Sequence, residues 1–329
     1  MNDNVMRSFV DLRRNFAVYP FESTMLESDR HEMTNRVISA LDEQEETWIL
    51  YTAADLDSKA KMTLEDIDLV ESVWLQNKAV SLLIRNDHSA LVCLHEQDHV
   101  LIRVAADPRD SLPAIRMAKG IAKLLSETSA FAKDERIGWL TAKPQYAGTG
   151  IQISFMLHLP MLVMMQQIKA VEQKTNASHG FYLRGCGPEE KNPGSLYCLS
   201  NLFTAYSSSE LLSNAVKRAA EEICGKEENL RKKVLKYATR SIYLDQIYRA
   251  WGILLYARRL TQAEFLAYWS KARLGACAGL LPTDIYSIDT LLDLTSKSKL
   301  IEQTDGVLDE HAIHFNRADT VRAALHGGT

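Results

Sequence analysis

The chain carries two kinds of hydrophobic pattern, which meet near residue 205. Before that point, short aliphatic runs separated by polar turns predict strands at 81–85, 90–94, 100–104, 137–141, 151–159, 181–184 and 195–199. Apolar residues at helical spacing predict helices over 112–131 and 161–174, the second beginning at Pro160. Because short turns join several of the strands, we expect a largely antiparallel sheet and an α+β fold.

After residue 205 the pattern is helical throughout. Capping boxes that begin at Ser207 and Thr261 each precede an amphipathic run, and a further apolar face contains Trp251. The charge-rich segment 225–240 is predicted to connect the two regions. We therefore divide the chain into a catalytic-fold domain over 1–238 and a helical C-terminal domain over 239–329.

Composition narrows the class of protein. The chain has 329 residues, of which 46% are hydrophobic, so one large core or two smaller ones can form. A net charge of −4 and a pI near 6.2 argue against a nucleic-acid-binding protein. The five cysteines include no C-x-x-C pair, which is typical of reduced thiols in the cytoplasm. A secretory signal is not evident, and the most apolar run, 155–165, is too short to span a membrane.

The segment 95–99, H-E-Q-D-H, matches the H-E-x-x-H signature of zinc proteases. That signature needs a helix, which places both histidines on one face around a single metal ion. Here the segment lies between two predicted strands, and an extended chain would separate His95 from His99 by roughly 13 Å. We therefore predict no zinc site in this loop.

A longer pattern lies further along the chain. Residues 138–150 read G-W-L-T-A-K-P-Q-Y-A-G-T-G, and residues 156–160 read M-L-H-L-P. Both resemble the ATP:guanido phosphotransferases, whose pattern here is G-Y-L-T-S-C-P-T-N-x-G-T-G-x-R-A-S-V-M-L-H-L-P, and in particular the bacterial protein-arginine kinases of the McsB type. Other matches occur in the family's order: R-N at 14–15, Y-P-F at 19–21, E-Q-D-H at 96–99 against family E-E-D-H, R-G at 184–185, S-N at 200–201, Y-R-A-W-G-I-L at 248–254 and R-L-G at 273–275.

The resemblance implies a catalytic domain around an antiparallel sheet, followed by a helical domain that dimerises in the McsB-type kinases. It also implies phosphoryl transfer from ATP, with Mg²⁺, to a guanidinium group. In such a reaction the protein mainly positions the reactants and neutralises charge. The family uses five arginines as a phosphate clamp. Four of the clamp positions hold other residues here, Phe9, Asp11, Leu101 and Gln152, and one keeps its arginine as Arg184.

The guanidinium side of the implied site is altered as well. The family's first glutamate, a ligand for magnesium or the guanidinium, is kept as Glu96, but the second, which binds and deprotonates the guanidinium, is Gln97. An amide cannot accept a proton as a carboxylate does. The family's cysteine is Lys143, whose ammonium would repel a guanidinium.

The outline R-G-x-x-x-E of the family is kept as Arg184, Gly185 and Glu189. Glycines at such a place can bring backbone amides near a phosphate. A strand end followed by a turn accounts for the same residues equally well. A glutamate such as Glu96, taken alone, is more often an ordinary loop carboxylate.

The size of the expected losses in rate favours a loss of catalysis. Removing one preorganised electrostatic stabiliser costs about 10² to 10³ in rate, so losing most of a clamp and a base would erase most of the acceleration. The simplest hypothesis is a McsB-like pseudokinase with a regulatory or binding role in protein quality control. It predicts weakened binding of ATP and Mg²⁺.

An active kinase with a rearranged clamp is the main alternative. Arg7 lies two residues before Phe9, and Arg103 lies two residues after Leu101, so both face the side of the lost arginines if the chain is extended. The other interpretation of Arg7 and Arg103 is a surface arginine that is solvated or that covers apolar area.

A third hypothesis is a phosphoarginine-binding adaptor. The McsB-type kinases carry an R-D-x-x-R-A motif that binds phosphoarginine, and residues 318–323 read A-D-T-V-R-A. Asp319 and Arg322 are the matching residues, and Arg317 lies one position early, about 100° around a helix. An ordinary polar helix face accounts for them as well. By family analogy, the expected partners are protein substrates, a McsA-like adaptor, a Clp protease system and a second copy of the chain.

Overall fold

A computed structural model describes residues 3–42, 47–178, 180–186, 192–204, 208–236, 242–303 and 309–326. Its centre is an eight-stranded sheet in the order β2-β3-β4-β5-β1-β8-β10-β9, and every neighbouring pair is antiparallel. The strands are β1 (Val5–Arg14), β2 (Trp48–Thr52), β3 (Ser81–Arg85), β4 (Ala90–Leu94), β5 (Val100–Ala105), β8 (Ile151–His158), β9 (Phe181–Gly185) and β10 (Leu196–Asn201). The predicted α+β class is confirmed.

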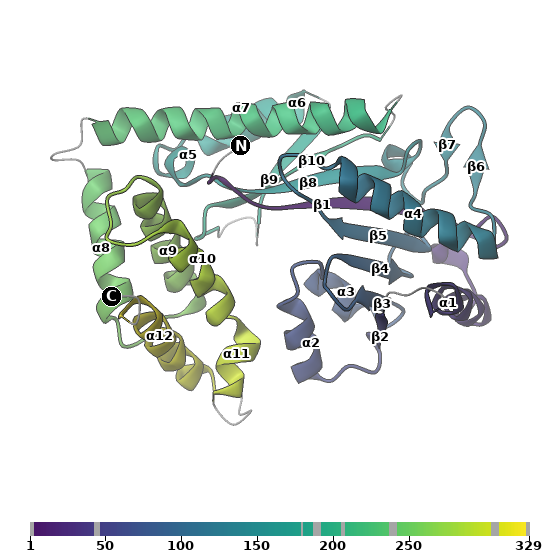
Figure 1. Cartoon of the computed structure of the whole chain (residues 1–329), viewed down its shortest axis with the longest axis horizontal. Helices are drawn as coiled ribbons and strands as arrows, with labels where there is room; N and C mark the ends of the chain where they lie inside the picture. Colours follow the sequence, from purple (N-terminus) through teal and green to yellow (C-terminus); the bar gives the residue numbers. More distant parts are fainter. Residues whose placement is uncertain are drawn as a thin grey trace.

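Strand β1 lies in the middle of the sheet, between β5 and β8 (Figure 1). Its side chains alternate between two faces, as the pleat of a strand requires. Val10 and Leu12 join the main core, whereas Asp11 and Phe9 point to the opposite face. The two faces of this one strand therefore separate the core from the candidate site.

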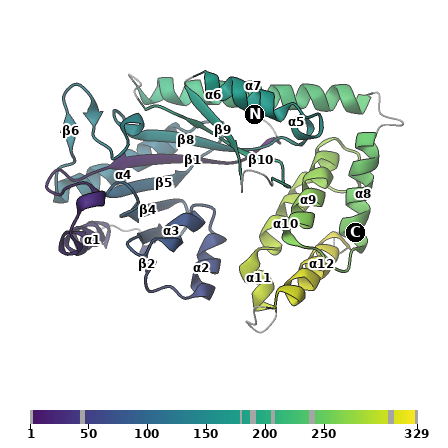
Figure 2. The ribbon, with the colours of Figure 1, turned by 180° about the vertical axis from the view of Figure 1, so that it is seen from behind.

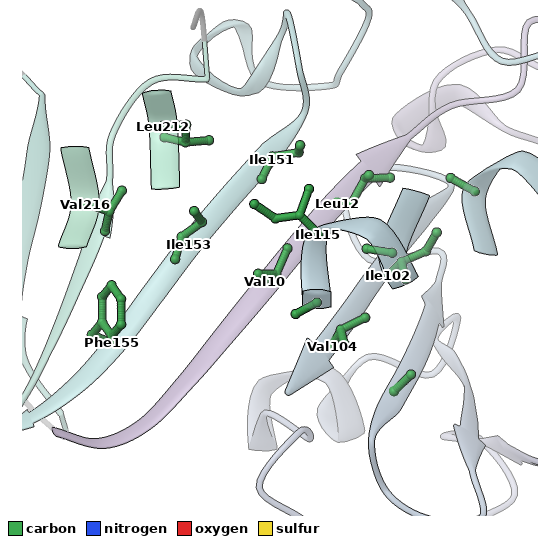
Figure 3. Close-up of a cluster of buried hydrophobic side chains, with 14 of the residues drawn as sticks. Val10, Leu12, Ile102, Val104, Ile115, Ile151, Ile153, Phe155, Leu212 and Val216 are labelled. Atoms are coloured by element: carbon green, nitrogen blue, oxygen red, sulfur yellow. The ribbon is translucent and has the colours of Figure 1, made fainter. Parts of the chain in front are cut away.

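Three long helices cover most of the core face of the sheet: α1 (Glu27–Asp42), α4 (Leu112–Thr128) and α7 (Ser209–Lys236). Figure 3 shows how residues of β1, β5 and β8 meet Ile115 of α4 and Leu212 and Val216 of α7. The spacing of these apolar residues on each helix is that of an amphipathic stripe. Burying the stripes against the sheet is the main source of stability on this face.

The opposite face is covered only in part. Helices α2 (Ser58–Glu65) and α3 (Ser72–Gln76) pack on the β3–β5 half, where Trp74 and Leu101 belong to a second hydrophobic cluster. Figures 1 and 2 place these helices on the side of the sheet away from α7.

The C-terminal region is helical, as predicted. Its helices are α8 (Ile242–Tyr256), α9 (Gln262–Cys277), α10 (Ile285–Leu294), α11 (Lys297–Glu302) and α12 (Glu310–His326). They enclose their own core around Phe265 and Trp269. The predicted capping box at Thr261 is confirmed, because its side chain and that of Glu264 each bond the other's backbone. Ser207, where the other box was expected, lies outside the described residues.

A buried polar contact joins the sheet to the helical region. Arg273 of α9 donates to Nδ1 of His158 at the end of β8 (3.1 Å) and to the carbonyl oxygen of Asp3 (2.6 Å). It also pairs with Asp289 of α10, with its Nε 2.7 Å from the carboxylate. The histidine of the M-L-H-L-P segment therefore lies where the two regions meet.

Three predicted elements differ from the structure. The strand over 137–141 shrinks to β7 (Gly138–Trp139), paired with β6 (Lys133–Asp134), because Gly138 has a φ of 95° and approaches Gly148 closely. The helix over 161–174 is divided into α5 (Pro160–Met164) and α6 (Ile168–Ala177) at Gln166, whose φ is 57°.

The third difference concerns the segment 225–240, which we expected to be a connection. Up to Lys236 it is the second half of α7, and its Leu230 packs against both hydrophobic clusters. Glu227 of this helix accepts hydrogen bonds from the backbone N–H groups of Met161 (2.7 Å) and Leu162 (2.8 Å). The charged segment therefore continues α7, and its Glu227 caps the amino end of α5. Among the described helices, none has an apolar stretch long enough to cross a membrane.

Glu227 gives the fold a pH-dependent element. Burial raises the pKa of its carboxyl from 4.5 to about 7, although the two N–H groups favour the charged form. Between these values the folded state holds the proton more tightly than the unfolded state. Raising the pH should therefore lower the free energy of unfolding, by at most about 1.4 kcal/mol per pH unit.

The Glu227→Gln variant should show a flatter dependence of unfolding free energy between about pH 5 and 8, because an amide does not titrate. Urea denaturation at several pH values measures this. Glu222→Gln, on the exposed side of the same helix, is the control and should keep the wild-type slope. Equal slopes for the wild type and Glu227→Gln would contradict the prediction.

Candidate active site

The five clamp positions inferred from the sequence share one face of the sheet. Asp11 stands opposite Arg103 on β5 and opposite Gln152 on β8, so these three residues form one row across the sheet. Arg184 lies on the edge strand β9, opposite Cys198 of β10. This is the face that α1, α4 and α7 leave free.

A buried ion pair occupies the centre of this face. Arg103 binds Asp11 through two hydrogen bonds, from Nε to Oδ1 (2.7 Å) and from Nη2 to Oδ2 (2.8 Å). Asp11 is 2% exposed and Arg103 8%. A two-bond arginine–carboxylate contact combines charge with matched geometry, so it is stronger than a single hydrogen bond.

The surroundings of Arg103 hold it in place. Its Nη2 also reaches Oε1 of Glu71 (2.7 Å), its Nη1 donates to the carbonyl oxygen of Leu69 (3.3 Å), and its guanidinium lies 4.6 Å from the ring centre of Trp74. Burial would raise the pKa of Asp11, but the charge and hydrogen bonds of Arg103 hold that pKa below its usual value. Both groups therefore remain charged at neutral pH.

The other replaced clamp positions carry no charge. Leu101 and Phe9 pack in the hydrophobic cluster with α2 and α3. Gln152 donates through Nε2 to the carbonyl oxygen of Asn201 (3.2 Å), which ties β8 to β10. Where the resemblance implies arginines, this face thus presents apolar surface, an amide and a carboxylate to an incoming polyphosphate.

Arg184 is exposed on the edge strand, and Gly185 follows it at the end of β9. A side chain at Gly185 would come within 3.2 Å of the Asn192 side chain, so the glycine is explained by local packing. Glu189, the third residue of the R-G-x-x-x-E outline, lies outside the described residues.

The loop 95–99 connects β4 to β5, as predicted for the H-E-x-x-H match. Its histidines have separate partners: His95 contacts Glu22 (3.0 Å) and Thr34 (2.9 Å), whereas Nδ1 of His99 accepts from the backbone of Phe16 (3.0 Å). Burial lowers the pKa of His99, although its hydrogen bond to Pro20 opposes the shift. The histidines belong to the scaffold that joins this loop to β1.

Asp98 has a similar structural role. Its Oδ1 accepts from Nδ2 of Asn15 and from the backbone N–H of Ala142, both at 2.6 Å. The side chain of Asn15 in turn accepts from the backbone N–H of His99 (2.8 Å). These bonds tie together the three segments that bear the family's motifs.

Glu96, Gln97 and Lys143 lie at the rim of the same region. Glu96 is half-buried, and burial raises the pKa of its carboxyl, whereas the charges of Arg13 and Lys143 oppose that rise. Gln97 and Lys143 are exposed. Of the two glutamates in the family's E-E pair, only the first is kept, as Glu96. Its carboxylate is already close to two cations of the same chain, Arg13 and Lys143.

Arg13 is a site residue that our sequence analysis did not identify. Its guanidinium lies 4.2 Å above the ring of Tyr146, and its side chain is 10% exposed. Asp11 and Asp98 each approach it only to 3.9 Å, and its buried Nη1 makes no hydrogen bond. Side chains two residues apart on a strand point to the same face, so the placement of Asp11 in the site is the signal that could have revealed Arg13.

Arg7 and Arg103 do not form the rearranged clamp that the sequence allowed. Arg103 is held by Asp11 and Glu71, and Nε of Arg7 pairs with Asp68 at 2.7 Å. The interpretation of Arg103 as a solvated or covering surface arginine was also wrong, because it is buried and paired. Glu71 could not be foreseen, since it comes from a separate segment before α3.

A cavity of about 1220 Å³ adjoins the Phe9 end of this face, between residues 51–69 and helices α10 and α11. Its described lining is acidic. The carboxylates are Asp57, Asp66, Asp68, Asp289, Asp293 and Glu302, and the cations are Arg7, Lys59 and Lys299. Such a lining disfavours a polyanion in the cavity.

The structure also describes the C-terminal residues that the resemblance matches to a phosphoarginine-binding motif. Asp319 and Arg322 of α12 form an ion pair with each other, and Arg322 donates to the carbonyl oxygen of Ala257. The Asp319 side chain is 63% exposed. Arg317, by contrast, is buried on another side of the helix.

Two family models match this chain. The model for "ATP:guanido phosphotransferase, C-terminal catalytic domain" covers residues 29–230. The model for "Protein-arginine kinase McsB C-terminal domain" covers residues 240–328.

Curated relatives agree along almost the whole length. The protein-arginine kinase of Brevibacillus brevis is 29% identical over 318 residues, which span 94% of this chain and 86% of that protein. The protein-arginine kinase of Bacillus subtilis is 26% identical, over 99% of this chain and 91% of that protein. A crystal structure of lombricine kinase is 16% identical with a TM-score of 0.59, covers 71% of this chain and 69% of that chain, and supports the fold.

The buried pair should be important for stability. Asp11→Ala leaves a buried arginine with only the partly exposed Glu71 as counter-charge, so we expect a loss of about 3–5 kcal/mol in unfolding free energy. Asp68→Ala breaks the exposed Arg7–Asp68 pair and should cost less than about 1 kcal/mol. Urea denaturation of both variants tests this, and equally small losses would show that the buried pair contributes little.

Proposed function

Since this chain belongs to the ATP:guanido phosphotransferase family, we propose that it is a catalytically impaired, McsB-like homologue of the protein-arginine kinases. Its role is regulatory or binding, in protein quality control. The Asp11–Arg103 ion pair is the observation that carries this proposal. An acid stands where the family would place a phosphate-binding arginine, and it neutralises a neighbouring arginine on the same face.

Charge balance supports weak binding of ATP. Phosphoryl transfer depends on cations that surround the triphosphate and the transferring group. Of the clamp positions on this face, Arg184 alone holds a cation, and it lies on the edge strand. These residues do not fit a Mg-ATP site built on an arginine clamp, and the acidic cavity beside them adds repulsion.

The acceptor side supports the same proposal. A guanidinium substrate needs a carboxylate that is free to bind it and accept its proton. The half-buried Glu96 already feels the charges of Arg13 and Lys143, and Gln97 cannot act as a base. Arg13 brings a guanidinium of the chain itself close to Asp98 and Glu96, so an incoming arginine meets a cation rather than a free carboxylate.

The proposal extends to organisation and partners by analogy with the family. The catalytic-fold domain would end near residue 238, and the helical domain that follows would form a homodimer. A McsA-like adaptor and a Clp protease system in the cytoplasm are the proposed partners. An impaired kinase could bind them without transferring phosphate.

The Mg-ATP response of the purified chain tests the loss of catalysis. We expect no saturable rise in melting temperature with Mg-ATP and no phosphoarginine on a generic protein substrate. An active protein-arginine kinase serves as the positive control in the same assays. Clear stabilisation by ATP, with turnover that Glu96→Ala abolishes and Glu135→Ala leaves intact, would contradict the proposal. Glu135 is suited to this comparison because it lies exposed in the β6–β7 turn.

Stabilisation by ATP together with turnover would support the second candidate, an active kinase with a rearranged site. One observation favours it: the buried Nη1 of Arg13 is a hydrogen-bond donor without a partner. Arg13→Ala would then reduce turnover sharply. For an impaired kinase, the same substitution has no turnover to reduce.

The third candidate, a phosphoarginine reader, would use Asp319 and Arg322. It predicts saturable binding of free phosphoarginine to the wild type, measured by calorimetry, and loss of that binding in Asp319→Ala. Because Asp319 is mostly exposed, its removal should leave the fold intact. Absence of binding to the wild type, or unchanged binding by Asp319→Ala, would remove these residues from consideration.

A further inference from the structure

Arg317 of α12 is a buried cation without a carboxylate partner. It is 3% exposed, and its Nη1 donates to the carbonyl oxygen of Leu260 at 2.9 Å. Its Nε is buried without a hydrogen bond. No acidic group among the described residues pairs with it, and burial alone lowers its pKa below the usual value. Burying an unpaired charge is costly, so this arrangement calls for a counter-ion.

A cavity of about 510 Å³ lies beside this guanidinium. Ile313 and Arg317 are its buried residues, and Lys297, Gln262 and Glu310 are exposed at its edge. His314 also lines it. The described lining of the cavity thus contains a guanidinium, an ammonium, an amide and an imidazole, and only one carboxylate.

The imidazole is arranged as a hydrogen-bond donor. Nη2 of Arg259 lies 3.1 Å from Nδ1 of His314, and an arginine can only donate, so Nδ1 accepts. Burial and the charges of Arg259 and Arg317 lower the pKa of His314, whereas Glu310 opposes this. The ring is therefore neutral near pH 7 and carries its proton on Nε2.

We propose that this cavity is an anion site for a phosphate group, free or as a monoester, with Arg317 as the central cation and Lys297 as the second. A tetrahedral dianion can engage both cations and the neighbouring donors at once, whereas a carboxylate carries less charge and fewer oxygens. The volume leaves room for an organic group on the phosphate. The site is independent of the proposed loss of kinase activity.

The site is also distinct from the Asp319–Arg322 pair. Arg317 and Arg322 are separated by five positions, which corresponds to about 140° around a helix. Arg322 has its own counter-charge in Asp319, so it does not require an external anion. This difference makes Arg322 a matched control on the same helix.

Titration of the full chain with inorganic phosphate and with phenyl phosphate, at constant ionic strength, tests the proposal. Calorimetry should show saturable binding of at least one of them to the wild type, and acetate should bind more weakly. If both phosphates bind equally, the group alone is recognised. If phenyl phosphate binds more tightly, the site accepts an ester. Absence of saturable binding of both would overturn the proposal.

Two substitutions locate the binding. Arg317→Met should weaken phosphate binding by roughly tenfold or more, and Arg322→Met should leave it unchanged. Without phosphate, Arg317→Met should be at least as stable as the wild type, because an uncompensated charge has been removed. Unchanged binding by Arg317→Met would overturn the assignment. Should that variant not fold, Lys297→Met at the exposed edge decides, since it must weaken phosphate binding if the cavity is the site.

Discussion

A charge inside a protein must be compensated, and the catalytic-fold face of this molecule depends on one such compensation. Arg103 and Asp11 lie at the centre of the sheet, sealed by Trp74 and the α2–α3 segment. A cluster of phosphate-binding arginines repels itself until a nucleotide arrives, so an enzyme must tolerate that repulsion in its empty state. Here the counter-charge is built into β1 and is present at all times. The arrangement favours a stable resting fold over a site that is completed by its ligand.

The family's motif residues divide by their physical role. Asn15, Asp98 and His99 are retained, and each bonds backbone groups that hold the β4–β5 loop to β1. Gln97 and Lys143, which the resemblance aligns with the family's catalytic glutamate and cysteine, are both exposed. Loss of an exposed catalytic group costs little stability, whereas loss of Asp98 would orphan buried donors. A chain that has lost catalysis, as proposed for this one, can therefore change its exposed catalytic residues and keep the buried structural ones.

Much of the fold could be predicted because the local and global signals agree. Strands β3, β4, β5 and β8 are short apolar runs between turns, and Thr261 and Glu264 form the capping box that their spacing indicates. The prediction failed where tertiary contacts override the local pattern. The segment after Gly225 looked like a charged linker, but Glu227 faces the amino end of α5 and cannot be recognised from its neighbours in sequence.

The candidate site shows the same limit. Alignment to a motif predicts which positions hold replaced arginines, but it could not reveal that Arg103 pairs with Asp11 or that Arg13 lies over the ring of Tyr146. Both facts depend on which residues share a face and on what covers it. The presence or absence of a counter-charge then distinguishes Arg103 from Arg317. Arg103 has its acids and needs nothing further, whereas Arg317 has a carbonyl oxygen, a neutral histidine and an open cavity. An arginine buried in that state implies a partner outside the chain, so the cavity beside Arg317 in the helical region is a place to look for a bound anion.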